Sequence, residues 1–271
     1  MPDARFAESE QPTVTVVIPA RNEALNLGWV LDRMPDCVSQ IILVDGQSVD
    51  GTVDVARQSG RNIQIIVEPA RGKGTAIRTG FAAAQGDYVV MLDADGSMDP
   101  VEIPRFVAPL SLGWEVVKGS RFLPSGGSTD ISRYRQMGNW ALLKIAQGLF
   151  GFHQTDFCYG YMALRRSVLP QLQLTATGFE IEAQIAVRAH MMGFRITEVP
   201  SMEAPRRNGQ SQLHPVRDGI RILQTMLANR AGPSVDKPTE QSPLRRPAPA
   251  AYQTHQPQGG TAAIRRSPAG D

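Results

Sequence analysis

The fold is decided by the stretch Tyr88-Val89-Val90-Met91-Leu92-Asp93-Ala94-Asp95-Gly96-Ser97. Its first five residues are an apolar run with the length of one buried strand. Residues i and i+2 of an extended segment point the same way, so the carboxylates of Asp93 and Asp95 can converge on one hard cation, Mg²⁺ or Mn²⁺. A turn that merely favours Asp and Gly is the alternative. Asp99-Pro100 then has the pattern of a helix start, which places the pair in a rigid corner.

Before this stretch, short apolar runs alternate with segments of helical periodicity. Strands are predicted at Thr13–Ile18, Ile41–Val44, Ile63–Val67 and Tyr88–Leu92, and helices at Glu23–Arg33, Thr52–Gln58 and Gly74–Ala84. This alternation indicates an α/β fold with a mostly parallel central sheet, whose ligands bind beyond the carboxyl ends of the strands. The residues expected at that edge follow each strand, in 19–23, 45–48, 68–74 and 93–97.

The second half of the chain is less regular. Further strands are predicted at Val116–Lys118, Tyr159–Leu164 and Ile196–Val199, and helices at Tyr134–Phe150, Glu180–Met192 and Pro215–Arg230. Residues 124–130, rich in Gly and Ser, predict a mobile loop. We expect a flexible N-terminus at 1–12, one α/β domain at 13–230 and a disordered, Pro-rich tail at 231–271, because the tail has too little apolar surface to offset the entropy of ordering.

The composition excludes several classes of protein. A net charge of +2 and an aromatic content of 6% argue against nucleic acid as a partner. No run reaches the ~18 apolar residues that span a bilayer, and no apolar signal core follows the N-terminus. We therefore expect a cytoplasmic protein, soluble or peripheral at the inner membrane face. Cys37 and Cys158 lie far apart in sequence, which predicts two reduced thiols.

Three further segments resemble signatures of the family 2 glycosyltransferases. They are Val17-Ile18-Pro19-Ala20-Arg21-Asn22-Glu23, Val44-Asp45-Gly46-Gln47-Ser48-Val49-Asp50-Gly51-Thr52 and Arg71-Gly72-Lys73-Gly74. With the Asp-Ala-Asp segment they occur in the family's order and at family-like spacing. The resemblance implies the GT-A fold, a single Rossmann-like domain that binds a nucleotide sugar. A sugar nucleotidyltransferase would instead need a glycine-rich loop with Arg and Lys directly after the first strand, and this chain lacks one.

Within the family, the chain is similar to the dolichyl- and polyprenyl-phosphate sugar (mannose or glucose) synthases. The segments that carry this similarity are 119–122 (GSRF), 155–160 (TDFCYG), 198–200 (EVP) and 206–211 (RRNGQS). The resemblance also implies the site residues. Pro19, Arg21, Glu23 and Asp45 would line the base and ribose pocket, Asp93 and Asp95 would bind the metal with Ala94 between them and Ser97 beside them, and Arg121 and Arg206 would meet phosphates.

Two other charged residues are assigned with an alternative each. Lys73 is implied as a phosphate or base-pocket residue, and a solvated turn lysine is the alternative. Glu182 is the candidate base if the acceptor is a hydroxyl, which must lose a proton, whereas a phosphate acceptor is already anionic. A simple partner of the helix dipole is the alternative for Glu182. Asp95, through the cation, completes the predicted catalytic pair, since the cation would stabilise the departing diphosphate.

We therefore expect an inverting, metal-dependent hexosyltransferase that moves a sugar from a nucleotide-sugar donor to a polyprenyl phosphate at the membrane face. A soluble small-molecule hydroxyl acceptor remains open, as does a non-catalytic nucleotide-sugar-binding protein. The helix at 215–230 carries an apolar stripe, Val216, Ile220, Leu223 and Leu227, that suits either a packed surface helix or a helix on a membrane surface.

Overall fold

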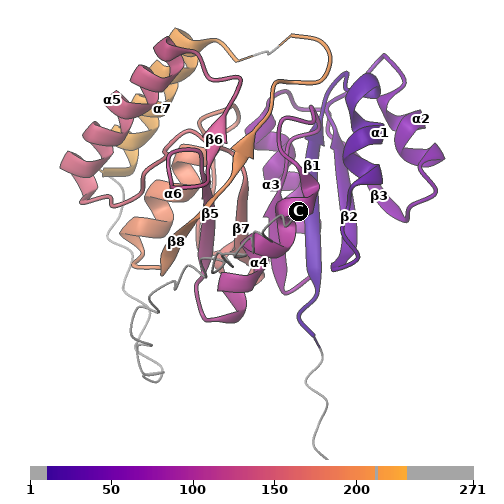
Figure 1. Ribbon diagram of the computed structural model, residues 1–271, viewed down its shortest axis with the longest axis horizontal. Helices are drawn as coiled ribbons and strands as arrows, with labels where there is room; N and C mark the ends of the chain where they lie inside the picture. The colour runs from indigo at the N-terminus through magenta and orange to yellow at the C-terminus, as the bar shows by residue number, and fades with distance from the viewer. Residues whose placement is uncertain (1–10, 211–212, 231–271) are drawn as a thin grey trace, which may run out of the picture. The chain divides into compact units, whose positions relative to one another are not determined.

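A sheet of seven strands forms the centre of the computed structural model, which describes residues 11–210 and 213–230 (Figure 1). The strands are β1 (Val14–Ala20), β2 (Val38–Asp45), β3 (Ile63–Val67), β4 (Tyr88–Met91), β5 (Val116–Ser120), β7 (Met162–Arg165) and β8 (Ile196–Pro200). Their order is β3-β2-β1-β4-β7-β5-β8. Neighbouring strands pair in parallel, except that β7 runs antiparallel to both β4 and β5. The predicted α/β fold with a mostly parallel sheet is confirmed.

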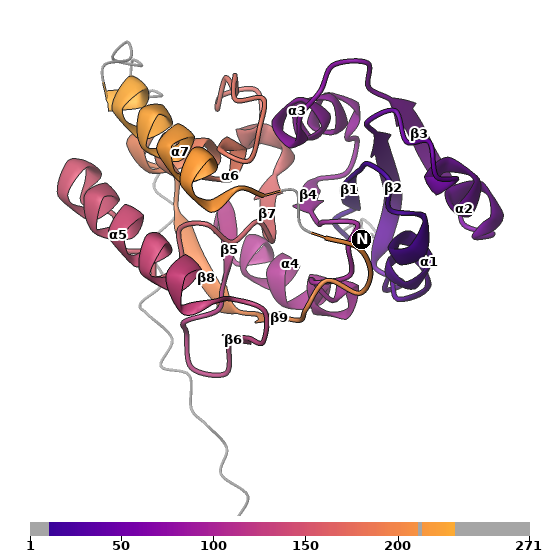
Figure 2. The same ribbon diagram turned by 90° about the horizontal axis from the view of Figure 1, so that it is seen from above.

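Helices cover both faces of this sheet (Figures 1 and 2). One face packs against α1 (Ala24–Asp32), α2 (Thr52–Gln58) and α4 (Ile103–Ser111), and the other against α3 (Lys73–Ala83) and α6 (Ile181–Met191). Strand residues are therefore apolar on both sides: Val16 and Ile18 of β1 join one core cluster, and Val17 joins the other. A third cluster joins α6 to α5 (Arg133–Phe150) and α7 (Pro215–Arg230), which contact each other.

The predicted elements exist, with bounds that shift by a few residues. The bounds of α2, β3 and α7 are those predicted. The Asp99 side chain accepts a hydrogen bond from the backbone N of Val101 at 3.1 Å, so it does cap a helix start. That start is a 3-10 turn, η1 (Pro100–Glu102), which continues into α4, and a second 3-10 turn, η2 (Arg166–Val168), follows β7.

The predicted loop at residues 124–130 is corrected in one respect, since it is not without regular structure, and its mobility stays a prediction. Within it lies a short strand, β6 (Gly127–Ser128), which pairs in parallel with β9 (Met202–Glu203). The backbone N of Thr129 donates to the carbonyl oxygen of Glu203 at 3.0 Å. A two-residue strand has no room for an apolar alternation, so its sequence carries no strand signal.

Two predicted segments fall outside the described residues: the flexible N-terminus up to residue 10, and the whole of the tail at 231–271. Among residues 11–210 and 213–230, no helix combines the length and the apolar character needed to cross a bilayer.

Candidate active site

A cleft of about 800 Å³ opens at the carboxyl ends of the parallel strands. Its walls contain almost all the residues predicted from the sequence, namely Pro19, Arg21, Glu23, Lys73, Asp93, Ala94, Asp95, Ser97, Arg121, Glu182 and Arg206. Residues that are far apart in the chain meet here because parallel strands bring their carboxyl ends to one edge of the sheet. Asp45 is the exception: it is buried beside Gly46, and Gly46 takes its place on the cleft wall.

The two aspartates after β4 both reach this cleft. Their side chains are partly exposed, 25% for Asp93 and 21% for Asp95. Asp93 pairs with Lys73, whose Nζ lies 2.6 Å from Oδ1. Asp95 accepts a hydrogen bond from the backbone N of Ser97 at 3.0 Å and lies 3.3 Å from Nη1 of Arg206. The pair is thus held at the mouth of a cavity large enough for a diphosphate.

Lys73 joins the two acidic sides of the cleft. Its Nζ donates to Oε1 of Glu182 at 2.7 Å as well as to Asp93. Burial alone would lower the pKa of Lys73, but the charges of Asp93 and Glu182 raise it above its ordinary value. Burial raises the pKa of Asp93 to about 6, against the opposing charge of Lys73 and with Asp95 and Glu182 adding to the rise. The ammonium group of Lys73 therefore carries its positive charge firmly. This single charge neutralises only half of the negative charge of Asp93 and Glu182.

Glycines make this contact possible. Gly72 has φ +117°, and a Cβ at Gly74 would lie 2.6 Å from the carbonyl oxygen of Ala176, so the start of α3 packs directly on the segment before α6. A Cβ at Gly160 would lie 2.8 Å from Oε1 of Glu182. Side chains at these positions would separate Lys73 from Glu182.

Arg206 closes the other side of the cleft. Its guanidinium bonds Oε1 of Glu23 and lies near Asp95, and its Nε donates to the carbonyl oxygen of Asn208 at 2.8 Å. The second oxygen of Glu23 accepts from Nδ2 of Asn26 at 2.7 Å. The segment after β9 thereby ties the first strand's loop to the aspartate pair.

Together these groups leave an excess of negative charge. Four carboxylates share two cations: Lys73 serves Asp93 and Glu182, while Arg206 serves Glu23 and Asp95. A divalent cation fits this imbalance. In the described part of the chain, no three His, Cys, Asp or Glu side chains gather as a metal cluster. A cation at this pair would thus need ligands from a substrate, which is how Mg²⁺ is commonly bound beside phosphates.

Asp45 ends β2 at the base-binding end predicted for the cleft. Its Oδ2 accepts a hydrogen bond from the backbone N of Ser48 at 3.0 Å. Its Oδ1 is buried and has no hydrogen-bond partner among the described residues. A buried acceptor without a partner is costly, but Asp45 does not line the cleft, so its part in binding a base stays a prediction.

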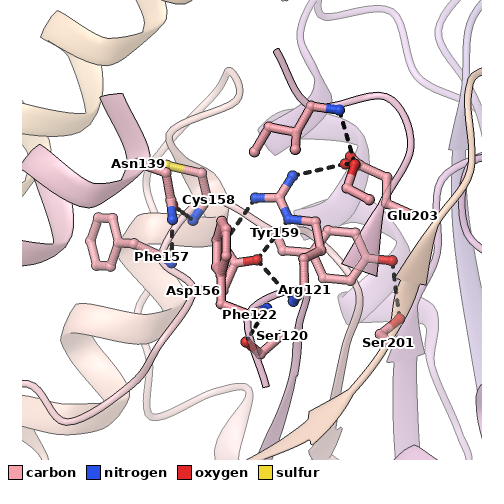
Figure 3. Close-up of polar contacts among 12 residues, drawn as sticks. Ser120, Arg121, Phe122, Asn139, Asp156, Phe157, Cys158, Tyr159, Ser201 and Glu203 are labelled. Atoms are coloured by element: carbon pink, nitrogen blue, oxygen red, sulfur yellow. Dashed lines mark hydrogen bonds and ion pairs between the residues drawn. The ribbon is translucent and has the colours of Figure 1, made fainter. Parts of the chain in front are cut away.

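Arg121 has a different setting from the one implied for a phosphate ligand (Figure 3). Its Nε and Nη2 donate to the two oxygens of Asp156 at 2.7 and 2.9 Å, and its Nη1 donates to Glu203 at 3.0 Å. The guanidinium also lies 4.9 Å from the ring centre of Tyr159. Arg121 is thus the centre of a buried ion network that holds β5, residues 155–158 and β9 together, and its role as a phosphate ligand stays a prediction.

Several residues on the cleft wall were missed by sequence reasoning. Glu203 reaches Arg121 from 82 positions away, with no local pattern to announce it. Arg135 of α5 and Arg217 and Arg221 of α7 also line the cleft. The spacing of four between the last two residues brings them to one face of their helix, but no pattern in the sequence indicates that this face meets the cleft.

Both cysteines are free thiols, as predicted. Burial raises the pKa of Cys158 to about 12, and Asp156 adds to the rise. Only a thiolate is a good nucleophile, so Cys158 is a packing residue of the cleft wall.

The fold and the site together define the class of protein. It is an α/β protein of the GT-A type, with an Asp-x-Asp pair that faces a cleft at the carboxyl ends of the parallel strands. The chain belongs to glycosyl transferase family 2, whose family model matches residues 15–172. It is 32% identical to the glycosyltransferase AglJ of Haloferax volcanii, over 76% of this chain and 68% of that protein. It is 31% identical to a dolichyl-phosphate hexose transferase of the same organism, over 79% of this chain and 92% of that protein.

A solved structure supports the same fold. Glucosyl-3-phosphoglycerate synthase from Mycobacterium tuberculosis, in complex with Mn²⁺, UDP and glucosyl-3-phosphoglycerate, superposes with a TM-score of 0.65. The match has 25% sequence identity and covers 82% of this chain and 81% of that one. That neighbour binds Mn²⁺ and UDP on this fold.

Proposed function

We propose that this protein is an inverting, metal-dependent glycosyltransferase that moves a sugar from a nucleoside diphosphate donor to a polyprenyl phosphate at the cytoplasmic membrane face. The observation that carries the proposal is the carboxylate pair, Asp93 and Asp95, each of which shares its cation with a second carboxylate, on a cleft large enough for a nucleotide sugar. Asp95 and Asp93 would hold Mg²⁺ or Mn²⁺, with Ser97 beside them.

Each side of the cleft would have its own task in donor binding. The bound cation would offset the charge that develops on the diphosphate as the sugar leaves. Arg206, with its planar set of donors, would exchange its carboxylate partners for phosphate oxygens. Pro19 and Arg21 on the cleft wall would contact the base, with Asp45 buried beside Gly46. Because the nucleotide leaves from one face of the anomeric carbon, the acceptor attacks from the other.

The contact that Glu182 makes supports an anionic acceptor. Its carboxylate is paired with Nζ of Lys73 at 2.7 Å. A phosphate oxygen needs no base, so an acceptor of this kind leaves Glu182 free to hold Lys73 in place. Arg135, Arg217 and Arg221 on the cleft wall suit a phosphate, and the relative named dolichyl-phosphate hexose transferase agrees with a lipid phosphate.

A soluble hydroxyl acceptor is the second candidate. The specific observation in its favour is the structural similarity to glucosyl-3-phosphoglycerate synthase, whose bound glucosyl-3-phosphoglycerate carries its sugar on a small phosphorylated acid. Glu182 lines the cleft and would then act as the base, taking the proton of the hydroxyl as the new bond forms.

The test is a transfer screen with the full chain. Radiolabelled nucleotide sugars are crossed with polyprenyl phosphate and with 3-phosphoglycerate, with Mg²⁺ or Mn²⁺ present, and products are extracted into organic solvent. We expect label in the organic phase, and none after chelation or with Asp95→Asn. Label confined to a water-soluble product would replace the lipid acceptor with the second candidate. Nucleotide-sugar binding without turnover on any acceptor would indicate a non-catalytic binding protein.

A further inference from the structure

Two neighbouring helices expose large apolar side chains beside the cleft. On α5 these are Tyr134, Met137 and Trp140, which are 58%, 63% and 59% exposed. On α7 they are Val216, Ile220 and Leu227, each about half exposed. The inward sides of the same helices are already filled, by Leu143 and Ala146 of α5 and by Ile222 and Met226 of α7. The outward residues therefore do not contribute to the hydrophobic core of the described chain. We call these six exposed residues the α5/α7 face.

The charged residues of these two helices are mostly basic. The two helices carry six basic residues, Arg133, Arg135, Lys144, Arg217, Arg221 and Arg230, against one acidic residue, Asp218, which is buried. The chain as a whole is nearly balanced, at +2. One exposed carboxylate, Asp130, lies just before α5 and pairs with Arg135 at 2.9 Å. A surface that combines exposed Trp, Tyr and Met with mostly basic flanks suits a lipid surface with anionic headgroups.

The face is continuous with the site. α5 and α7 contact each other and lie together at one side of the sheet (Figure 2). Arg135 of α5 and Arg217 and Arg221 of α7 line the same cleft as the aspartate pair. A lipid-linked phosphate at headgroup depth would thus enter the cleft between these helices without leaving the bilayer.

We propose that the α5/α7 face docks on an anionic membrane surface and aligns the cleft mouth with the headgroup layer. The inference rests on the proposed function for its choice of a lipid acceptor. Trp140 and Tyr134 would sit at the interface, where aromatic rings with a polar edge are favoured. Met137, Val216 and Ile220 would enter the acyl boundary, and the arginines would stay among the headgroups. Attraction to the headgroups weakens as salt rises.

The experiment is vesicle flotation of the full chain without any sugar substrate. Vesicles of phosphatidylcholine alone are compared with vesicles that also contain phosphatidylglycerol. We expect flotation with the anionic vesicles, a blue shift of Trp140 emission, and weaker binding at high salt. Met137→Ser with Trp140→Ser should weaken binding at least about tenfold, because two large apolar side chains no longer leave water. The matched control is Val101→Ser with Leu112→Ser, two exposed apolar residues near α4, which should float as the wild type does.

Two results would overturn the inference. One is equal flotation of the wild type and the α5 double variant. The other is a wild-type dimer that the α5 double variant converts to monomers, since the face would then join two copies of the chain. Transfer to a short, water-soluble isoprenyl phosphate is measured in parallel and should be unchanged in the double variant. Absence of that transfer in a wild type that still floats would count against the proposed function only.

Discussion

Single side chains at the cleft show what motif matching can and cannot predict. The motifs predicted that Asp93, Asp95, Lys73 and Arg206 share one site, because each motif follows a parallel strand or closes the domain. They did not predict the partners: Lys73 meets Glu182 from 109 positions away, and Arg206 meets Glu23 from 183. Long-range pairs are set by the packing of whole elements, and no local pattern in one sequence records them.

Asp93 should make stability depend on pH. Its pKa of about 6 in the folded chain compares with an ordinary value of 3.8. Between these values the folded chain keeps a proton that the unfolded chain has released, so the contribution of Asp93 to the free energy of unfolding falls as pH rises. Urea unfolding of the metal-free proteins measures the free energy of unfolding of the wild type and of Asp93→Asn. The wild-type value minus the Asp93→Asn value should fall from pH 4 to pH 6.5. A difference independent of pH would contradict the raised pKa.

Lys73→Met should destabilise the fold. The variant leaves Asp93 and Glu182 in the cleft wall without their shared counter-charge, and breaking a buried pair in this way costs about 3 kcal/mol. Denaturant unfolding at pH 7 measures the loss, and adding Glu182→Gln should recover part of it. Lys144→Met, on the exposed side of α5, is the matched control and should stay within ~0.5 kcal/mol of the wild type. Equal stability of the two lysine variants would show that Lys73 is a solvated turn residue.

The elements were predicted better than their pairing. Hydrophobic periodicity located α2 and β3 to the residue, because local spacing alone decides where such a short element lies. The antiparallel insertion of β7 between β4 and β5 had no local signal, since a buried strand has the same apolar pattern in either direction. The pairing of β6 with β9 was missed for another reason: two residues are too few to form an apolar pattern.

Gly80 tests how closely α3 packs on the sheet. A Cβ there would lie 2.3 Å from a methyl group of Val17 in β1, so Gly80→Ala should force α3 away and cost about 1–3 kcal/mol of unfolding free energy. Gly148 in α5 has nothing within 4 Å of such a Cβ. Gly148→Ala should therefore be neutral or stabilise by about 0.5–1 kcal/mol. Thermal unfolding of both variants measures the contrast, and a similar effect of the two changes would contradict the close packing.

In the molecule as a whole, the proposed donor side and acceptor side of the cleft draw on different halves of the sheet. Glu23, Asp93 and Asp95 follow β1 and β4, whereas α5 and α7 supply arginines and exposed apolar residues. The sequence predicted the first half well, because its motifs are local. It predicted a helix at Tyr134–Phe150, which is α5, but not its orientation. Apolar residues lie on two sides of this helix. Only the packing on α6 shows that Leu143 faces inward while Trp140 faces outward.

The most direct measurement is Mn²⁺ binding followed by electron paramagnetic resonance, with and without UDP, for the wild type and Asp95→Asn. We predict that the wild type binds one Mn²⁺ per chain and that UDP tightens the binding, because the diphosphate supplies the ligands that Asp93 and Asp95 lack. Asp95→Asn should weaken the ternary complex by roughly tenfold or more while keeping the fold, as judged by circular dichroism. Equal Mn²⁺ affinity in the two proteins, or binding that ignores UDP, would contradict a metal site at this carboxylate pair.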